Sequence, residues 1–166
     1  MHRMLRDVPS REVRGMNASE LRGMDYESAR LYGMPHVSAR YTGEGVNNYR
    51  LDRDALCPVC GRPVSNAHHE PPKGHGRVFV LRTRWGTFPM RPALIALCGS
   101  GTTGCHGERH AGLLRIRWEW YDDRDAEAWE NGFLLSHGFE PHDQRLYGFG
   151  RWVFRRDGEK VAEWRG

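Results

Sequence analysis

The stretch that decides the fold begins with Cys57-Pro-Val-Cys60-Gly61 and ends with Cys98-Gly-Ser-Gly-Thr-Thr-Gly-Cys105-His106-Gly-Glu-Arg-His110. It contains all four cysteines of the chain. A Cys-x-x-Cys followed by glycine brings two sulfurs to one ion, and the glycine-rich spacer is flexible enough to fold the other two inward. Because four thiolates complete the coordination of zinc, we predict a closed structural site formed by Cys57, Cys60, Cys98 and Cys105. The alternatives are two disulfides, which a reducing compartment disfavours, or buried inert thiols.

Histidines around the cysteine pairs have the spacing of a second metal site. His106 and His110 are four residues apart, so on a helix they project from one face and can chelate one ion. His68 and His69 are adjacent, and on an extended segment their side chains point to opposite sides. We predict that His68, His106 and His110 bind a divalent cation with an open coordination position, and that His69 is a general base. His75 is a lower-ranked alternative to His68.

The remaining polar groups near these motifs have ordinary structural interpretations. Glu70 follows the histidine pair and either accepts a hydrogen bond from an imidazole or is simply solvated. The other histidines are expected to be surface or packed side chains: His2, His36, His137 and His142.

Positive charge is concentrated in the segment that holds both predicted metal sites. The whole chain has a net charge of +4, but residues 57–117 carry nine basic and two acidic side chains, a net +7. Residues 118–166 carry a net −4. A polyanion such as DNA or RNA is therefore the expected partner, with a solvated basic face as the alternative. The candidate contacts to backbone phosphates are Arg77, Arg82, Arg84 and Arg91.

Composition indicates no membrane or secretory segment. The chain has no apolar run of about 18 residues, which a transmembrane helix requires. The N-terminal residues Met-His-Arg-Met-Leu-Arg-Asp are not followed by the apolar region of a signal peptide. We therefore expect a cytoplasmic protein.

Local patterns predict an α+β protein in three segments. Residues 1–54 are predicted to form an arm of short helices, one opened by the capping box Asn17-Ala-Ser-Glu20 and one from Tyr26 to Tyr32. Gly43 to Asn48 would be a linker. Residues 55–117 are predicted to form the metal-binding core, and residues 118–166 a helix and a hairpin packed on it.

Within the last two segments the patterns predict individual elements. A strand is expected at 77–82, a short strand or the start of a buried turn at 92–97, and a helix within 106–117. Trp118, Tyr121, Asp125 and Trp129 would share one face of a further helix. Asp157-Gly158 predicts a β-hairpin between residues 151–156 and 159–164.

The order of these motifs resembles the HNH endonucleases, the ββα-metal nuclease class, in the form that carries a four-cysteine zinc site. The resemblance covers residues 55–112 and implies a ββα-metal core that cleaves DNA phosphodiester bonds. His69 matches the base that deprotonates water, and His68, His106 and His110 match ligands of the catalytic ion. That ion would be Mg²⁺ or Mn²⁺, with Ni²⁺ or Zn²⁺ as alternatives. Phage and bacterial proteins carry this form, so the expected location is the cytoplasm of a bacterium or of a phage-infected cell.

One position departs from the family pattern. The family's middle asparagine usually lies a few residues before the third zinc cysteine and helps to fix the loop that bears the base. Ala93 stands there in this chain, so either another group such as Asn66 orients His69, or activity is reduced. The alternative functions are a zinc-stabilised nucleic-acid-binding module with a decayed nuclease site, or a phage accessory interaction protein. A homodimer would allow double-strand cleavage, and phage packaging machinery is a further possible partner.

Overall fold

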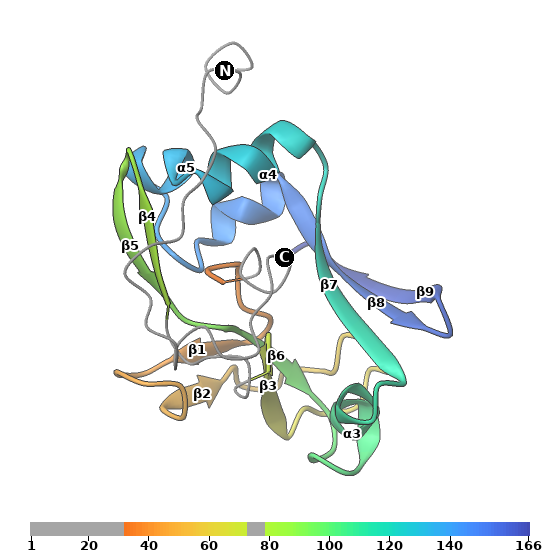
Figure 1. The fold of residues 1–166 in the computed structure, drawn as a ribbon. Coiled ribbons are helices and arrows are strands. Elements are labelled where there is room, and N and C mark those ends of the chain that lie inside the picture. The colour runs from red at the N-terminus through yellow and green to blue at the C-terminus, as the bar shows by residue number, and fades with distance from the viewer. Residues whose placement is uncertain (1–31, 73–78) are drawn as a thin grey trace.

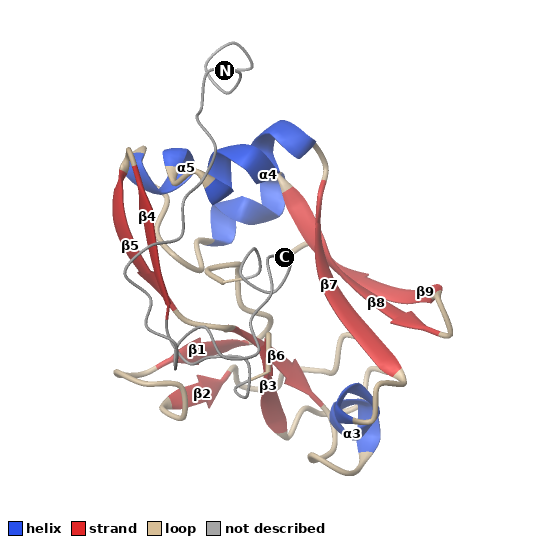
Figure 2. Cartoon of the chain, viewed as in Figure 1, coloured by secondary structure: helices blue, strands red, loops and turns tan. Residues whose placement is uncertain are grey.

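The structure is a computed structural model that describes residues 32–72 and 79–166. These residues form an α+β protein with small antiparallel sheets and short helices (Figures 1 and 2). The two short helices expected before Tyr32 lie outside the described residues, as do His75 and Arg77. In the described part of the chain, no helix combines the length and the apolar composition of a membrane span.

Two strands and a helix hold the predicted ligand residues. Strand β3 (Asn66–Glu70) pairs in antiparallel register with β6 (Ala93–Leu97), which places His68 opposite Ile95 and His69 opposite Leu94. All five residues of β6 are buried, as expected of its unbroken apolar sequence. Helix α3 (Gly104–His110) follows β6 after a glycine-rich loop. The strand expected at 92–97 and the helix expected to carry His106 and His110 are therefore confirmed.

A hairpin is inserted between β3 and β6. It consists of β4 (Phe79–Thr83) and β5 (Gly86–Met90), so the strand expected at 77–82 is confirmed over its described residues. The turn of the hairpin packs near α5, because a Cβ atom on Gly132 would lie 2.7 Å from Thr83 Oγ1. Figure 1 shows this hairpin beside α5, at the other end of the molecule from α3.

The segment before the metal-binding core is not helical where it is described. Strands β1 (Ala39–Tyr41) and β2 (Tyr49–Leu51) form an antiparallel hairpin. The expected linker 43–48 lies in the loop that connects them. The prediction of a helical arm over residues 1–54 was wrong for this part of the chain. Residues 39–41 pair with residues 49–51 as strands, with Ala39 buried and Arg40 exposed. Val37 bridges to Ile95 in parallel, which joins this segment to the β3–β6 pair.

The C-terminal part forms a three-stranded sheet and two α-helices. Strand β7 (Leu114–Trp120) pairs with β8 (Gly150–Arg156), which pairs with β9 (Glu159–Trp164). Between β7 and β8 lie α4 (Asp123–Glu130), α5 (Phe133–Ser136) and the 3₁₀ helix η2 (Gln144–Gly148). The hairpin predicted at Asp157-Gly158 is confirmed, and both residues have the positive φ of its turn.

The predicted helical face that began at Trp118 is wrong in its first half. Leu114, Ile116 and Trp118 are buried and alternate with exposed or partly exposed polar residues, which is the period of a strand. The helix begins only at Asp123, where the Asp122 carboxylate accepts a hydrogen bond from the Arg124 amide at 2.8 Å.

A single large cluster of buried side chains connects all three predicted segments. Its members include Met34, Cys57, Leu97, Ile116 and Trp152. Residues next to the predicted cysteine and histidine ligands therefore pack into the same hydrophobic core as the three-stranded C-terminal sheet.

Candidate metal centres

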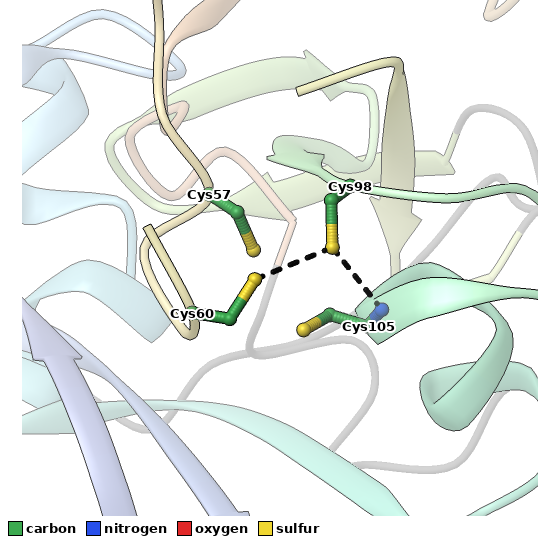
Figure 3. Close-up of side chains that lie close together, drawn as sticks. All are labelled: Cys57, Cys60, Cys98 and Cys105. Carbon is green, nitrogen blue, oxygen red and sulfur yellow. Dashed lines mark hydrogen bonds between the residues drawn. The ribbon is translucent and has the colours of Figure 1, made fainter. Parts of the chain in front are cut away.

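The four cysteines come together as predicted. One sulfur from each lies within 4.8 Å of the others, and the described cysteines form no disulfide. Figure 3 shows the four side chains pointing toward one another from separate parts of the chain. The sulfurs of Cys60 and Cys98 are 3.5 Å apart, close to the spacing of about 3.8 Å expected on a tetrahedral ion with metal–sulfur distances of about 2.3 Å. The donor set therefore fits zinc.

Two tight turns bring the sulfurs into this arrangement. The Cys57 amide donates to the Arg62 carbonyl at 2.7 Å, and the Gly61 amide donates to the Cys57 carbonyl at 2.9 Å. In the second turn the Cys105 amide points at the Cys98 sulfur at 3.4 Å. Gly99 has φ +84°, and a Cβ atom there would lie 2.0 Å from the Thr103 carbonyl oxygen. Glycine at position 99 is therefore a steric requirement of the turn.

Two of the four thiols resist ionisation in the absence of a cation. Burial and the negative charge of Cys57 raise the pKa of the Cys105 thiol above its ordinary value. Burial also raises the pKa of the Cys98 thiol. A divalent cation would remove this penalty by neutralising the thiolates. It would tie the loop before β3, the end of β6 and the start of α3 to one point.

Three imidazoles form the second group. Ring nitrogens of His68, His106 and His110 lie within 4.8 Å of one another. The Nε2 atoms of His106 and His110 are 3.0 Å apart, whereas two nitrogens on one tetrahedral ion stand about 3.3 Å apart. His68 is buried and His110 is exposed, so the group opens toward solvent on the side of His110. Within the described part of the chain it offers three ligands, which leaves a coordination position open.

A buried ion pair holds His68 in place. Its Nε2 lies 3.0 Å from Glu70 Oε2, and Arg109 donates from Nε and Nη2 to the two Glu70 oxygens, each at 3.1 Å. Burial opposes ionisation of Glu70, but the His68 hydrogen bond and the Arg109 charge outweigh it, so the pKa of the carboxyl lies below its ordinary value. Burial lowers the pKa of His68. An ionised Glu70 accepts the proton of neutral His68 Nε2, which leaves the lone pair on Nδ1.

His69 lies on the same strand and is held by a backbone carbonyl. Its Nε2 lies 2.5 Å from the carbonyl oxygen of Val46, in the β1–β2 loop. A carbonyl can only accept, so Nε2 carries the proton and the neutral ring is basic at Nδ1. Tyr49 packs against the ring, with centroids 5.8 Å apart and nearly perpendicular planes. Asn66, the candidate for this orienting role, instead donates to the Gly99 carbonyl at 3.2 Å.

Arg91 fixes the loop that supplies this carbonyl. Its Nη1 donates to the carbonyl oxygens of Gly43 and Gly45 at 2.6 and 3.0 Å. Its guanidinium carbon lies 3.8 Å from the centre of the Tyr41 ring. The loop is thus clamped on both sides of its bend, directly before Val46. Arg91 was predicted to contact phosphate. In the structure its side chain holds the loop whose Val46 carbonyl accepts the hydrogen bond of His69.

The four candidate histidines line one cleft. It has a volume of about 500 Å³, and its lining includes Tyr49 and Asn66 together with the four histidines: His68, His69, His106 and His110. His68 and His69 are adjacent on β3, yet both line this cleft. A water or an ester held there would lie beside the three candidate metal ligands and His69.

The other predicted phosphate contacts lie elsewhere. Arg84 is exposed at the turn of the β4–β5 hairpin and stacks on Trp85, with its guanidinium carbon 4.6 Å from the ring centre. Arg82 lies within β4, and Arg77 is outside the described residues. Phosphate binding by these arginines remains a prediction.

Two contributors to the site were missed by sequence reasoning. Arg109 lies three residues after His106 on α3, and this i, i+3 spacing was a usable signal. The Val46 carbonyl had no signal, because a backbone acceptor is available at every residue.

No family model, curated protein or solved structure matches this chain.

Proposed function

We propose that this protein is a metal-dependent endonuclease of the HNH type that hydrolyses phosphodiester bonds in DNA. The observation that carries the proposal is the placement of three convergent imidazoles and a carbonyl-held histidine around one cleft. The thiolate cluster supports it, because a closed zinc site beside an open histidine site separates a structural ion from a reactive one.

The residues have distinct roles in the proposed reaction. His68, His106 and His110 would hold the divalent cation, and Glu70 would orient His68 through its Nε2 proton. When bound, the cation supplies a Lewis acid for a phosphate oxygen and stabilises negative charge on the leaving oxygen. Mg²⁺ or Mn²⁺ is the ion expected in a cell, and three imidazoles also make Zn²⁺ or Ni²⁺ suitable by ligand preference.

His69 acts as the general base. Its Nδ1 takes a proton from a water molecule while Nε2 keeps its hydrogen bond to Val46, so the carbonyl also stabilises the imidazolium that forms. The water oxygen then bonds to phosphorus, and the bond between phosphorus and the leaving ester oxygen breaks. The hydrogen bonds of Arg91 hold the loop and so keep the His69 ring in one orientation. Ala93 has no polar group with which to orient His69.

The test is nicking of supercoiled plasmid in the presence of Mg²⁺, Mn²⁺ or Ni²⁺. We expect metal-dependent nicking by the wild type, and a loss of at least about a hundredfold in His69→Ala, the usual contribution of a general base. His137→Ala is the matched control, because His137 is exposed and packs on Phe133 away from the cleft. Equal cutting by wild type and His69→Ala would refute the role of His69.

A binding module with a decayed nuclease site is the second candidate. Ala93 favours it, since this residue is fully buried and pairs with Glu70 without offering a polar group. It predicts that folded, zinc-loaded protein binds duplex DNA but never nicks it under any of the three metals.

A further inference from the structure

A basic face on the C-terminal sheet begins where the histidine helix ends. Arg115 and Arg117 are exposed on β7, and Arg155 lies directly opposite Arg115 on β8. They line a cleft of about 450 Å³ whose other walls include Gly112 and Leu113. We call Arg115, Arg117 and Arg155 the arginine face. One acid, Asp157 at the hairpin turn, also lines the cleft.

The charges on this face are only partly neutralised. Glu119 forms ion pairs with Arg151 and Arg155, at 3.5 and 2.5 Å. Among the described residues, Arg115 and Arg117 form neither an ion pair nor a hydrogen bond through their side chains. Because Glu119 already neutralises Arg155, the uncompensated charge of this face is that of Arg115 and Arg117, and it has an electrostatic cost in the isolated protein. An anionic partner would remove that cost.

The arginine face follows the helix of His106 and His110 directly along the chain. His110 is the last residue of α3 and is exposed, and Gly112, two residues later, already lines the arginine cleft. Figure 1 shows α3 at the end of β7 where the strand begins. Leu113, which also lines the arginine cleft, is 60% exposed and adds an apolar contact beside the arginines. A long polyanion leaving the histidine cleft past His110 would meet the three arginines.

We propose that the arginine face binds the backbone phosphates of the DNA on one side of the cleavage point. This proposal rests on the proposed nuclease function, which makes nucleic acid the polyanion. Charge complementarity argues for phosphates: guanidinium groups on a rigid strand present several donors each and bind phosphate oxygens in pairs. The contacts would place the duplex without reading its sequence.

The experiment is DNA binding in the His69→Ala background, which prevents cutting while both metal sites remain. A fluorescent duplex is titrated by anisotropy over a range of salt concentrations. We expect Arg115→Ala/Arg117→Ala to weaken binding by roughly tenfold or more at about 0.1 M salt, and to reduce the salt slope by about 2, because each lost phosphate contact contributes about 0.9. Zinc content and circular dichroism confirm that the variant is folded.

The matched control is Arg40→Ala/Arg50→Ala. These arginines are also exposed and directly opposite each other, but alternation turns them away from Tyr49, which lines the histidine cleft. The control should change affinity by less than about threefold. Equal losses in the two double variants would overturn the proposal, since affinity would then follow net charge. Unchanged binding in Arg115→Ala/Arg117→Ala, or no binding by the parent, would also overturn it.

Plasmid nicking separates this proposal from the proposed function. If the wild type nicks with metal while Arg115→Ala/Arg117→Ala binds DNA normally, the nuclease stands and the arginine face falls. If the wild type never nicks but the double variant loses DNA binding, the arginine face stands and the nuclease falls.

Discussion

Replacing Arg91 by alanine tests whether this side chain positions His69 or contacts DNA. In the structure its Nη1 bridges the Gly43 and Gly45 carbonyls and its guanidinium stacks on Tyr41. Alanine removes all three contacts and frees the loop that presents the Val46 carbonyl. The β1–β2 strands stay paired, so we expect a local loosening of the loop.

The size of the effect follows from these contacts. Hydrogen bonds that involve a charged group contribute about 1.5–3 kcal/mol each, and an exposed cation–π contact about 0.5–1 kcal/mol. Arg91 is half-buried and one nitrogen makes both bonds, so we take the lower end and expect a loss of about 2 kcal/mol in the free energy of unfolding. A general base that is no longer held in one orientation should lower turnover by roughly tenfold to a hundredfold.

The assay compares Arg91→Ala with Arg84→Ala, which removes the same charge from the exposed hairpin turn. Nicking turnover, DNA affinity and the salt slope of binding are measured for both. A positioning role predicts lower turnover in Arg91→Ala with an affinity within about twofold of wild type. Weaker binding and a smaller salt slope with unchanged turnover would refute it, and would restore Arg91 as a phosphate contact.

Three further perturbations test other parts of the structure. Cys98→Ser should lose the bound zinc and lower the free energy of unfolding by more than about 4 kcal/mol, measured by metal analysis and denaturant titration; a stable, zinc-free variant would contradict the structural role. Glu70→Gln should weaken metal binding at the histidine site by about tenfold to a hundredfold in calorimetry, because His68 loses its ionised acceptor; unchanged affinity would argue that Glu70 only neutralises Arg109. Burial lowers the pKa of His36 to about 2 and that of His142 to about 4. As pH falls below about 6.5, both imidazoles are protonated in the unfolded chain but stay neutral in the folded one, so the free energy of unfolding decreases. Each of the two histidines should lower the free energy of unfolding by about 2 kcal/mol between about pH 7.5 and pH 5. His142→Asn should therefore make the free energy of unfolding less dependent on pH than the control His137→Asn does, as measured by denaturant titration.

Motif spacing was sufficient to predict both ligand groups. The Cys-x-x-Cys turn, the glycine-rich spacer and the i, i+4 histidines are each local features, and each produced the expected local geometry. The Asp157-Gly158 hairpin was predictable for the same reason, since its turn type depends on two residues.

The misassigned elements depend on tertiary contacts or on competing periods. Trp118 belongs to a strand because Leu114 and Ile116 alternate with arginines, and this alternation competed with a helical spacing of aromatic residues further along. The β1–β2 hairpin is short, and it is stabilised by packing near β6 more than by its own sequence.

The support of His69 also depends on parts of the chain that are distant in sequence. Arg91 and the Gly43 and Gly45 carbonyls are more than forty residues apart. No local pattern relates an arginine to a backbone carbonyl at that separation. The sequence alone therefore gives no indication that Arg91 holds the loop next to His69, and the structure is needed to find it.

The most direct test of the proposed division of roles is the metal-concentration dependence of plasmid nicking by wild type, His110→Ala and His69→Ala. If His110 is a ligand and His69 a base, His110→Ala raises the half-saturating metal concentration by at least about tenfold, whereas His69→Ala lowers the rate and leaves that concentration unchanged. Nicking that needs no added metal after dialysis against chelator, or an unchanged metal dependence in His110→Ala, would contradict a catalytic ion at the histidine cluster.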